Sequence, residues 1–302
     1  MNQNVVLPNA GATARFSPII ELARLFPPEG ARVLLKLETN GPTGSVKDRA
    51  VRSMLDSAQA LGALSPGTRI VEATGGAEGL ALASAAAIRG IPLTLFAPEG
   101  SYVNRIQTLQ ALGAVIEFTP KSKGVSGALR AVKTLANAPE FWSPNLFENP
   151  ANPGAHEATT GPEIWNASQG SVDAFVAGVG SGGTFMGVSR YLRRRNPSIE
   201  LIAVEPKESP VLSGGKPAAH GVVGLGCGFV PPIFDRNLPN AIETVSTEEA
   251  AFWTRKLAQT EGLSVGISTG ANLAVVARYA SRRENNNKTV ATVAFSSQLV
   301  DF

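Results

Sequence analysis

A lysine at the start of a helix-like segment is the residue of this sequence whose position most directly suggests chemistry. Lys47 follows a strand-like run at 33–38 and a Gly- and Pro-containing turn at 41–44, and it precedes a helix-like run at 49–61. Ser45 is a plausible N-cap, which places Lys47 in the first helical turn. The positive end of the helix dipole disfavours an ammonium there, and a neutral amine is the nucleophile that forms a Schiff base. The alternative is a solvated surface lysine.

Two further glycine-rich junctions also follow strand-like runs and precede helix-like runs. The first contains Thr74, Gly75, Gly76, Ala77 and Glu78, and the second contains Gly180, Ser181, Gly182, Gly183 and Thr184. Such turns present backbone N–H groups to anions at a helix N-terminus, and the hydroxyls of the second junction add donors. The alternatives for the second junction are a structural turn and a dinucleotide fingerprint, in which Glu205 would be the acidic residue.

A fourth junction, at 265–272, places Ser268 at the start of a helix-like run. Its hydroxyl could face a ligand or cap the helix, and Thr269 could fill the capping role instead. A lysine, a phosphate cradle and a polar partner for a pyridine nitrogen are together what pyridoxal phosphate requires. The four junctions therefore point to that cofactor.

The elements that must position these junctions alternate along the chain. Most apolar runs are short and continuous, as in strands of a parallel sheet that are buried on both faces. The expected strands are 33–38, 69–73, 92–96, 114–118, 174–177, 201–204 and 290–295. The expected helices are 49–61, 79–89, 104–112, 126–135, 183–194, 247–261 and 269–282. The pattern predicts an α/β fold, and the turn-rich segment 149–153 is a candidate crossing between lobes.

Length, composition and charge narrow the class of protein. The chain has 302 residues, 43% of them hydrophobic and 17% charged, which is enough for a large core and two lobes. Its net charge of +3 is small and spread out, so nucleic-acid binding is not expected. One cysteine and two histidines exclude an intrachain disulfide and predict no metal site. The absence of a basic leader and of a long apolar run predicts a cytoplasmic protein without a membrane span.

The order of these motifs resembles that of the fold-type II, pyridoxal-phosphate-dependent cysteine synthase and cystathionine beta-synthase family over almost the whole chain. The segments that carry the resemblance are 17–22 (SPIIEL), 44–49 (GSVKDR), 149–165, 180–184 (GSGGT), 204–206, 224–229 and 266–270 (GISTG). The resemblance implies that Lys47 binds the cofactor covalently and later moves protons. It also implies that 180–184 hold the phosphate and that Ser268 faces the pyridine nitrogen. A serine at that position favours β-elimination through an aminoacrylate.

The resemblance also implies an architecture and a class of reaction. The expected fold is tryptophan synthase beta-like, with two lobes that are each a mostly parallel sheet covered by helices. The smaller lobe would be 40–147, the larger lobe would be 1–39 plus 148–302, and the cofactor would lie between them. The resemblance further implies a homodimer and a transferase or lyase of amino-acid biosynthesis that takes a small amino-acid substrate.

The substrate-binding junction departs from the family, which reads Thr-Ser-Gly-Asn-Thr-Gly where this chain has residues 74–79. Ala77 cannot replace the asparagine that touches the cofactor, Gly75 lacks a hydroxyl, and Glu78 brings a charge of the wrong sign to a carboxylate site. Leu146 stands where the family has glutamine, and 296–301 replace the family's Asp-Ser-Gly-Glu-Arg-Tyr. The expectation is an intact cofactor site and a rebuilt substrate site.

The expected function is therefore β-replacement or β-elimination on an activated serine-like or cysteine-like amino acid, with a non-standard substrate or nucleophile. Glu78 would recognise a cationic group or act as a base, unless it is a solvated helix-start glutamate. One alternative is a cofactor-binding homologue with little catalysis that acts as a partner or sensor protein. A further alternative is a nicotinamide-dependent enzyme.

Overall fold

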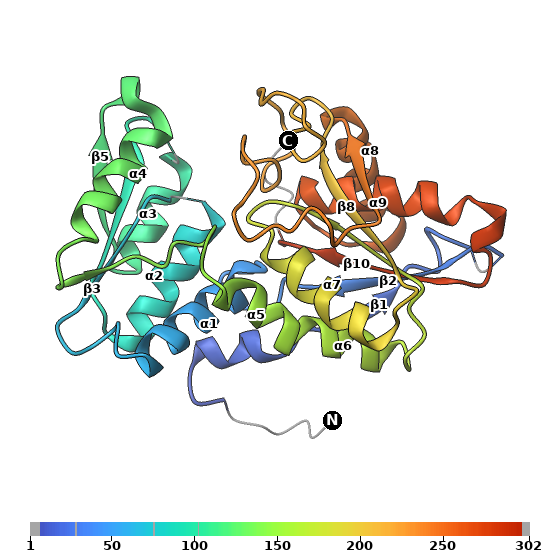
Figure 1. Cartoon of the computed structure of the whole chain (residues 1–302), viewed down its shortest axis with the longest axis horizontal. Coiled ribbons are helices and arrows are strands. Elements are labelled where there is room, and N and C mark those ends of the chain that lie inside the picture. Colours follow the sequence, from blue (N-terminus) through green and yellow to red (C-terminus); the bar gives the residue numbers. More distant parts are fainter. Residues whose placement is uncertain (1–6, 28, 75, 102, 298–302) are drawn as a thin grey trace. The chain divides into compact units, whose positions relative to one another are not determined.

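The chain forms two compact units, which are described separately here. The computed structural model describes residues 7–27, 29–74, 76–101 and 103–297. The first unit consists of 7–15 and Asn40–Ala151, and the second consists of Phe16–Thr39 and 152–297 (Figure 1). Residues 7–15 and 148–151 thus lie in the first unit, whereas the sequence-based boundaries placed them in the larger lobe.

The first unit is built on a four-stranded parallel sheet with the order β5-β4-β3-β6. Its strands are β3 (Arg69–Glu72), β4 (Leu93–Pro98), β5 (Val115–Thr119) and β6 (Phe141–Trp142). Its helices are η1 (Ala10–Arg15), α1 (Lys47–Ala60), α2 (Ala77–Arg89), α3 (Val103–Ala111), η2 (Lys121–Lys123) and α4 (Gly124–Leu135). Because η1 packs against α1 and α2, residues 10–15 belong to this unit.

One apolar core holds the first unit together. It joins α1, α2, β3 and β4 through side chains that are shielded from solvent: Val51, Met54, Leu55, Ile70, Leu82 and Leu95. Burial of each such side chain stabilises the fold by about 1.5–3 kcal/mol relative to exposure. The core fixes the carboxyl end of β3 and the first turns of α1 and α2, which carry Lys47 and the junction at 74–78.

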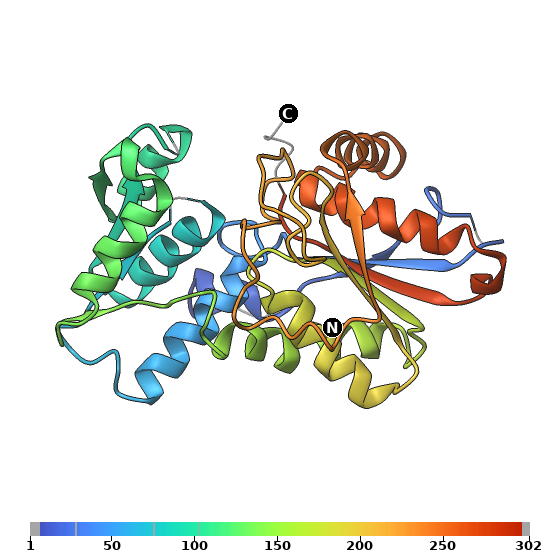
Figure 2. The ribbon, with the colours of Figure 1, turned by 45° about the horizontal axis from the view of Figure 1, so that its top comes forward.

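The second unit is built on a six-stranded sheet with the order β1-β2-β10-β7-β8-β9. Only the β1–β2 pair is antiparallel. The strands are β1 (Ile19–Glu21), β2 (Arg32–Leu37), β7 (Ala174–Gly178), β8 (Glu200–Pro206), β9 (Ala241–Val245) and β10 (Thr289–Ala294). The helices are α5 (Ala151–Ala158), α6 (Thr160–Ala167), α7 (Gly183–Arg195), α8 (Thr247–Glu261), α9 (Ile267–Ala280) and η3 (Arg283–Asn285). Helices α8 and α9 cover one face of the sheet and α6 and α7 the other (Figure 2).

The predicted α/β class, with mostly parallel sheets covered by helices, is confirmed. Every strand and helix expected from the sequence is present with its ends within a few residues. The prediction missed β6, β9, α5 and α6, because the two strands are short or half-buried and α5 begins within a segment with two prolines. Proline is tolerated in the first turn of a helix, so Pro153 does not end α5. Within the described ranges, no helix is long and apolar enough to cross a membrane.

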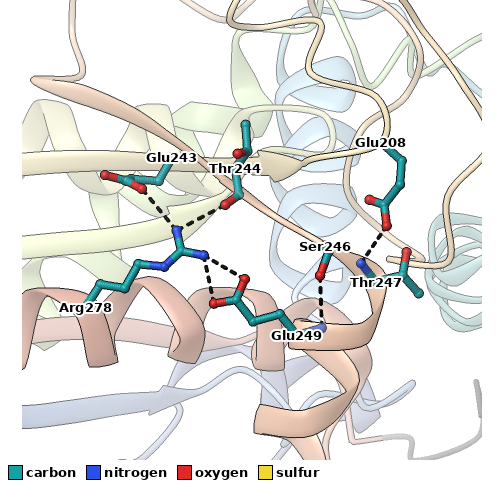
Figure 3. A network of polar contacts seen from close by, with 7 residues as sticks. All are labelled: Glu208, Glu243, Thr244, Ser246, Thr247, Glu249 and Arg278. Carbon is teal, nitrogen blue, oxygen red and sulfur yellow. Dashed lines mark hydrogen bonds and ion pairs between the residues drawn. The ribbon is translucent and has the colours of Figure 1, made fainter.

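A polar network ties α8, α9 and β9 together at the edge of the second unit (Figure 3). Both carboxylate oxygens of Glu249 accept hydrogen bonds from Nη2 of Arg278, at 2.7 and 2.6 Å. Nη1 of Arg278 donates to Glu243 and to the carbonyl of Thr244, at 3.1 Å each. The Ser246 hydroxyl caps α8 by accepting from the Glu249 N–H at 3.2 Å.

Removal of this cap is expected to destabilise the protein without changing its chemistry. Ser246→Ala leaves the Glu249 N–H without its acceptor and is expected to lower the free energy of unfolding by about 1 kcal/mol. Ser246→Asn keeps an acceptor oxygen and is expected to stay within a few tenths of a kcal/mol. Urea unfolding of the three proteins measures the difference. Equal losses in both variants would mean that the cap contributes nothing.

Candidate functional site

Lys47 is the first residue of α1 and is half-buried. The turn before it is held by the Asp48 carboxylate, which accepts from the Thr43 N–H at 3.1 Å, the Thr43 hydroxyl at 2.8 Å and the Ser45 N–H at 3.4 Å. A Cβ on Gly41 would collide with the Asp48 side chain, so the turn requires glycine there. Burial raises the pKa of Asp48, and the hydrogen bonds from Thr43 and Ser45 oppose that shift.

The expected capping of α1 by Ser45 is wrong. The N-cap is Val46, whose side chain makes no capping hydrogen bond. The Ser45 hydroxyl is buried and has no hydrogen-bond partner among the residues that the structure describes. The first turn of α1 thus combines backbone N–H groups without a side-chain cap and a buried hydroxyl for which the described residues supply no partner, and it also carries Lys47.

The junction at 74–78 joins the carboxyl end of β3 to the start of α2. Gly76 is the N-cap of α2 and supplies no side-chain cap, so the first N–H groups of this helix are also uncapped. A Cβ placed on Gly76 would lie 3.7 Å from Nη1 of Arg105 in α3. Ala77 and Glu78 are the first two residues of α2, and Gly75 lies outside the described residues. A helix N-terminus next to a guanidinium favours an anion.

Two carboxyl groups lie close together at this junction. Glu72 ends β3, is buried, and was not singled out by the sequence analysis. Its carboxylate accepts from the Ala73 N–H at 2.8 Å, the Asn145 N–H at 3.0 Å and the Ser143 hydroxyl at 3.1 Å. A lone acidic residue at the end of an apolar strand was the signal that could have revealed it.

Glu78 is half-buried, so it is not the solvated helix-start glutamate considered above. Burial and the negative charge of Glu72 raise the pKa of Glu78 to about 8, while the Lys47 ammonium and a hydrogen bond from Thr74 act in the opposite direction. Its Oε1 is shielded from solvent and has no hydrogen-bond partner within the described part of the chain. The pKa of Glu78 thus lies above the ordinary carboxyl value, which favours the neutral form over the charge of the wrong sign expected from the sequence.

Leu146, which stands where the family has glutamine, belongs to the core of the first unit. Its side chain is buried and joins the apolar cluster of α1, α2 and β3. The apolar core thus accounts for the leucine. Of the C-terminal departure at 296–301, only Ser296 and Ser297 are among the described residues.

In the second unit, the junction at 180–184 joins β7 to α7. Gly182 is the N-cap of α7, with φ of 89°, and no side chain caps this helix. A Cβ on Gly180 would collide with the carbonyl oxygen of Gly224, and one on Gly183 would collide with the side chain of Asn152. These glycines allow the backbone to pack closely. The first backbone N–H groups of α7 lack a side-chain cap, and such a helix N-terminus is an arrangement that binds phosphate.

The two hydroxyl residues of this junction are held by helix α5, which the sequence analysis missed. Nδ2 of Asn152 donates to the Ser181 hydroxyl at 3.1 Å. The Thr184 hydroxyl lies 3.3 Å from Nε2 of His156, whose Nδ1 lies 2.8 Å from the Thr160 hydroxyl. Asn152 and His156 therefore position the junction, and they lie in the 149–165 segment on which the resemblance partly rests.

Ser268 lies in the first turn of α9 and is buried. The N-cap of α9 is Gly266, so the capping role considered for Ser268 or Thr269 is wrong. The Thr269 hydroxyl instead accepts from the Phe295 N–H at 3.4 Å. A Cβ on Gly224 would lie 3.8 Å from the Ser268 hydroxyl, so the segment at Gly224 has Gly180 on one side and Ser268 on the other.

Each unit thus gathers its own share of the predicted residues. The first unit brings Glu78 near Lys47 and near Glu72, and the second brings the 180–184 junction near the segment that borders Ser268. Among the described residues, no group of three or more His, Cys, Asp or Glu side chains could hold a metal ion.

The sequence matches known proteins over nearly its whole length. Residues 12–295 match the family described as "Pyridoxal-phosphate dependent enzyme". The cysteine synthase of Staphylococcus aureus is 40% identical over 279 residues, which are 92% of this chain and 89% of that protein.

Solved structures are similar over nearly the whole chain, at somewhat lower identity. The cysteine synthase of Entamoeba histolytica is 34% identical, with a TM-score of 0.95 over 99% of this chain and 90% of that one. An O-acetylserine dependent cystathionine beta-synthase from Helicobacter pylori is 35% identical, with a TM-score of 0.88 over 99% of this chain and 97% of that one.

Proposed function

Because the chain belongs to the family of pyridoxal-phosphate-dependent enzymes, we propose that it catalyses β-replacement on an O-acylated serine. It is a cysteine synthase-like enzyme of fold type II, and pyridoxal 5'-phosphate is its cofactor, as the motifs predicted. The alternative of a nicotinamide-dependent enzyme is therefore wrong. We further propose the substrate, the nucleophile and the roles of individual residues.

We assign cofactor binding to the residues of the lysine, phosphate and Ser268 junctions. Lys47 is the covalent attachment point, because its amine lies in the first turn of a helix that no side chain caps. Gly180, Ser181, Gly182, Gly183 and Thr184 hold the phosphate, which the uncapped start of α7 and its close-packed glycines fit. Ser268 is the polar partner of the pyridine nitrogen. When bound, the cofactor stabilises the negative charge that develops at the α carbon of the substrate.

The residues of this chain then handle protons and orientation. Nζ of Lys47 takes the proton from the substrate α carbon and later returns it, as a general base and acid. The Ser268 hydroxyl is neutral, so it leaves the pyridine nitrogen largely unprotonated and favours departure of the β substituent. His156 and Asn152 orient the hydroxyls of Thr184 and Ser181 and have no direct part in the chemistry.

The junction at Thr74, Gly75, Gly76, Ala77 and Glu78 is proposed to bind the amino-acid substrate. Support comes from the uncapped start of α2 and the guanidinium of Arg105 nearby. Because the side chains here differ from the family pattern, we propose a donor or nucleophile that differs from O-acetylserine plus sulfide. The retained attachment lysine beside an altered substrate junction is the observation that carries this proposal.

The cofactor absorbance tests it. Purified holoenzyme is titrated with serine, O-acetylserine, O-phosphoserine and cysteine, and the acetate, phosphate or sulfide that is released is measured. We expect one donor to shift the absorbance and to lose its β substituent. Sulfide, ammonia and a thiol-containing amino acid are then compared as nucleophiles. An absorbance that no donor moves would overturn the proposal in favour of a cofactor-binding homologue with little catalysis.

A cytoplasmic homodimer is the proposed state of the enzyme. A single cysteine in 302 residues fits a reducing compartment. Light scattering on the purified holoenzyme measures the mass, and one chain per particle would contradict the dimer.

A further inference from the structure

The carboxyl pair at the start of α2 is the part of the first unit whose chemistry the proposed roles leave unexplained. Glu78 stands where the cysteine synthase family has an uncharged threonine, yet its side chain is half-buried rather than turned to solvent. Its Oε1 is shielded and has no hydrogen-bond partner among the described residues. A shielded carboxyl oxygen without a partner costs free energy unless a ligand satisfies it.

The hydrogen bonds decide which member of the pair carries the proton. Burial raises the pKa of Glu72 as well, but its carboxylate accepts three hydrogen bonds, from two backbone N–H groups and the Ser143 hydroxyl, which act in the opposite direction. Glu78 accepts one, from Thr74. Two neighbouring buried carboxylates repel each other, so the one with fewer donors keeps its proton. The pKa of Glu78 is accordingly raised to about 8 by burial and by the charge of Glu72.

The other elements packed on α2 place positive charge at the same junction. Lys47 at the start of α1 acts on Glu78 electrostatically, and Arg105 of α3 lies beside Gly76. Strand β4 has no titratable residue, and the described side chains of η1 include none either. Two cations and the uncapped start of α2 thus surround a neutral acid, and this setting suits an anionic ligand group.

We propose that Glu78 acts as a neutral carboxylic acid at neutral pH and donates its proton in a hydrogen bond to the carboxylate of the amino-acid substrate. The inference rests on the proposed function insofar as that function makes the ligand an amino acid. A protonated carboxyl group has one O–H donor, so it can replace a hydroxyl donor at such a site. Once Glu78 loses this proton, it repels the same carboxylate. Substrate affinity must therefore fall as the pH rises through about 8.

A pair of unreactive ligands isolates the carboxylate. L-alanine has no leaving group, and L-alaninol replaces its carboxylate with a hydroxymethyl group. Calorimetry gives both dissociation constants for the holoenzyme from about pH 6 to about pH 10. Their ratio is the carboxylate preference, and because both ligands carry an amine of similar basicity, the titration of the amine largely cancels in it.

The variants assign the effect to Glu78. The wild-type preference is expected to fall by about tenfold to a hundredfold as the pH rises through about 8, because a hydrogen bond to a charged group is lost. Glu78→Gln keeps an N–H donor and cannot ionise, so its preference is expected to stay constant. Glu78→Ala is expected to show the reduced preference at every pH. A wild-type preference that is flat across this range, or that rises above pH 8, would overturn the inference.

The pH dependence of the melting temperature reports the protonation of Glu78 without any ligand. The folded protein holds a proton on Glu78 between the ordinary carboxyl pKa of 4.5 and about 8, whereas the unfolded chain does not. The melting temperature of the wild type relative to Glu78→Gln is therefore expected to fall as the pH rises across that window. A difference in melting temperature between the two proteins that does not change with pH would mean that Glu78 does not hold this proton and would overturn the inference.

Different results would contradict the proposed β-replacement and the donor role of Glu78. Absence of β-replacement with every donor would overturn the proposed function, yet the carboxylate preference and the melting curves would still report on Glu78. Turnover with an intact carboxylate preference in Glu78→Ala would overturn only the donor role of Glu78.

Discussion

Replacement of Lys47 by alanine is expected to reduce β-replacement by about 10²–10⁴-fold or more, because the variant loses both the covalent attachment of the cofactor and the proton acceptor. Lys47 is half-buried at the start of α1 and is not part of the apolar core of the first unit, so its loss should not unfold the protein. Initial rates measure the activity. Mass spectrometry after borohydride reduction measures whether the cofactor is attached to the peptide that contains residue 47.

Lys47→Arg is the matched control for charge. Arginine keeps the positive charge and most of the length of the side chain but stays protonated, so it cannot act as the nucleophile. We expect it to be as inactive as Lys47→Ala, with a similar melting temperature in both variants. Cofactor attachment at another lysine in the wild type, or substantial activity in either variant, would contradict the role given to Lys47.

The fold was largely readable from the sequence because its strands are buried on both faces. Strands β7 and β10 are buried at every residue, and such runs of small and β-branched apolar residues stand out against the helices between them. Helix α5 was missed because its local composition resembles that of a turn: proline and asparagine, as at Pro153 and Asn152, are typical turn residues. Only tertiary packing shows that Asn152 and His156 serve the 180–184 junction.

The sequence could predict the glycine-rich turns of the candidate site, because their glycine spacing follows from backbone geometry. It could not predict the pKa values of the buried carboxyl groups, because these depend on tertiary packing. The collisions that a Cβ would cause at Gly180 and Gly183 explain the glycine pattern. No sequence pattern could show that the charge of Glu72 acts on Glu78, because the approach of the two carboxyl groups depends on tertiary packing. The raised pKa of Glu78 reflects this packing and could not be predicted from the sequence.

Replacement of Gly180 by alanine is expected to weaken cofactor binding by about a hundredfold and to lower the free energy of unfolding by about 1–3 kcal/mol. The new Cβ would meet the carbonyl oxygen of Gly224, and this segment is fixed by the hydrogen bond from the Gly226 N–H to the Val179 carbonyl at 3.1 Å. Because the obstacle is backbone, the junction itself must move, and its N–H groups then lose their alignment with the phosphate. Equilibrium dialysis of the cofactor and urea unfolding measure the two effects.

Gly154→Ala is the control for the same substitution where space is available. Gly154 lies in α5 of the same unit, and a Cβ there meets nothing within 4 Å. Alanine at this helical position reduces the freedom of the unfolded chain, so we expect a gain of about 0.4–1 kcal/mol and unchanged cofactor affinity. If Gly180→Ala also bound the cofactor normally, the close packing against Gly224 would not be what shapes the 180–184 junction, and the phosphate would have to be held elsewhere. If both variants lost the cofactor, the loss would reflect a general sensitivity of this unit to added methyl groups rather than the geometry of its phosphate junction.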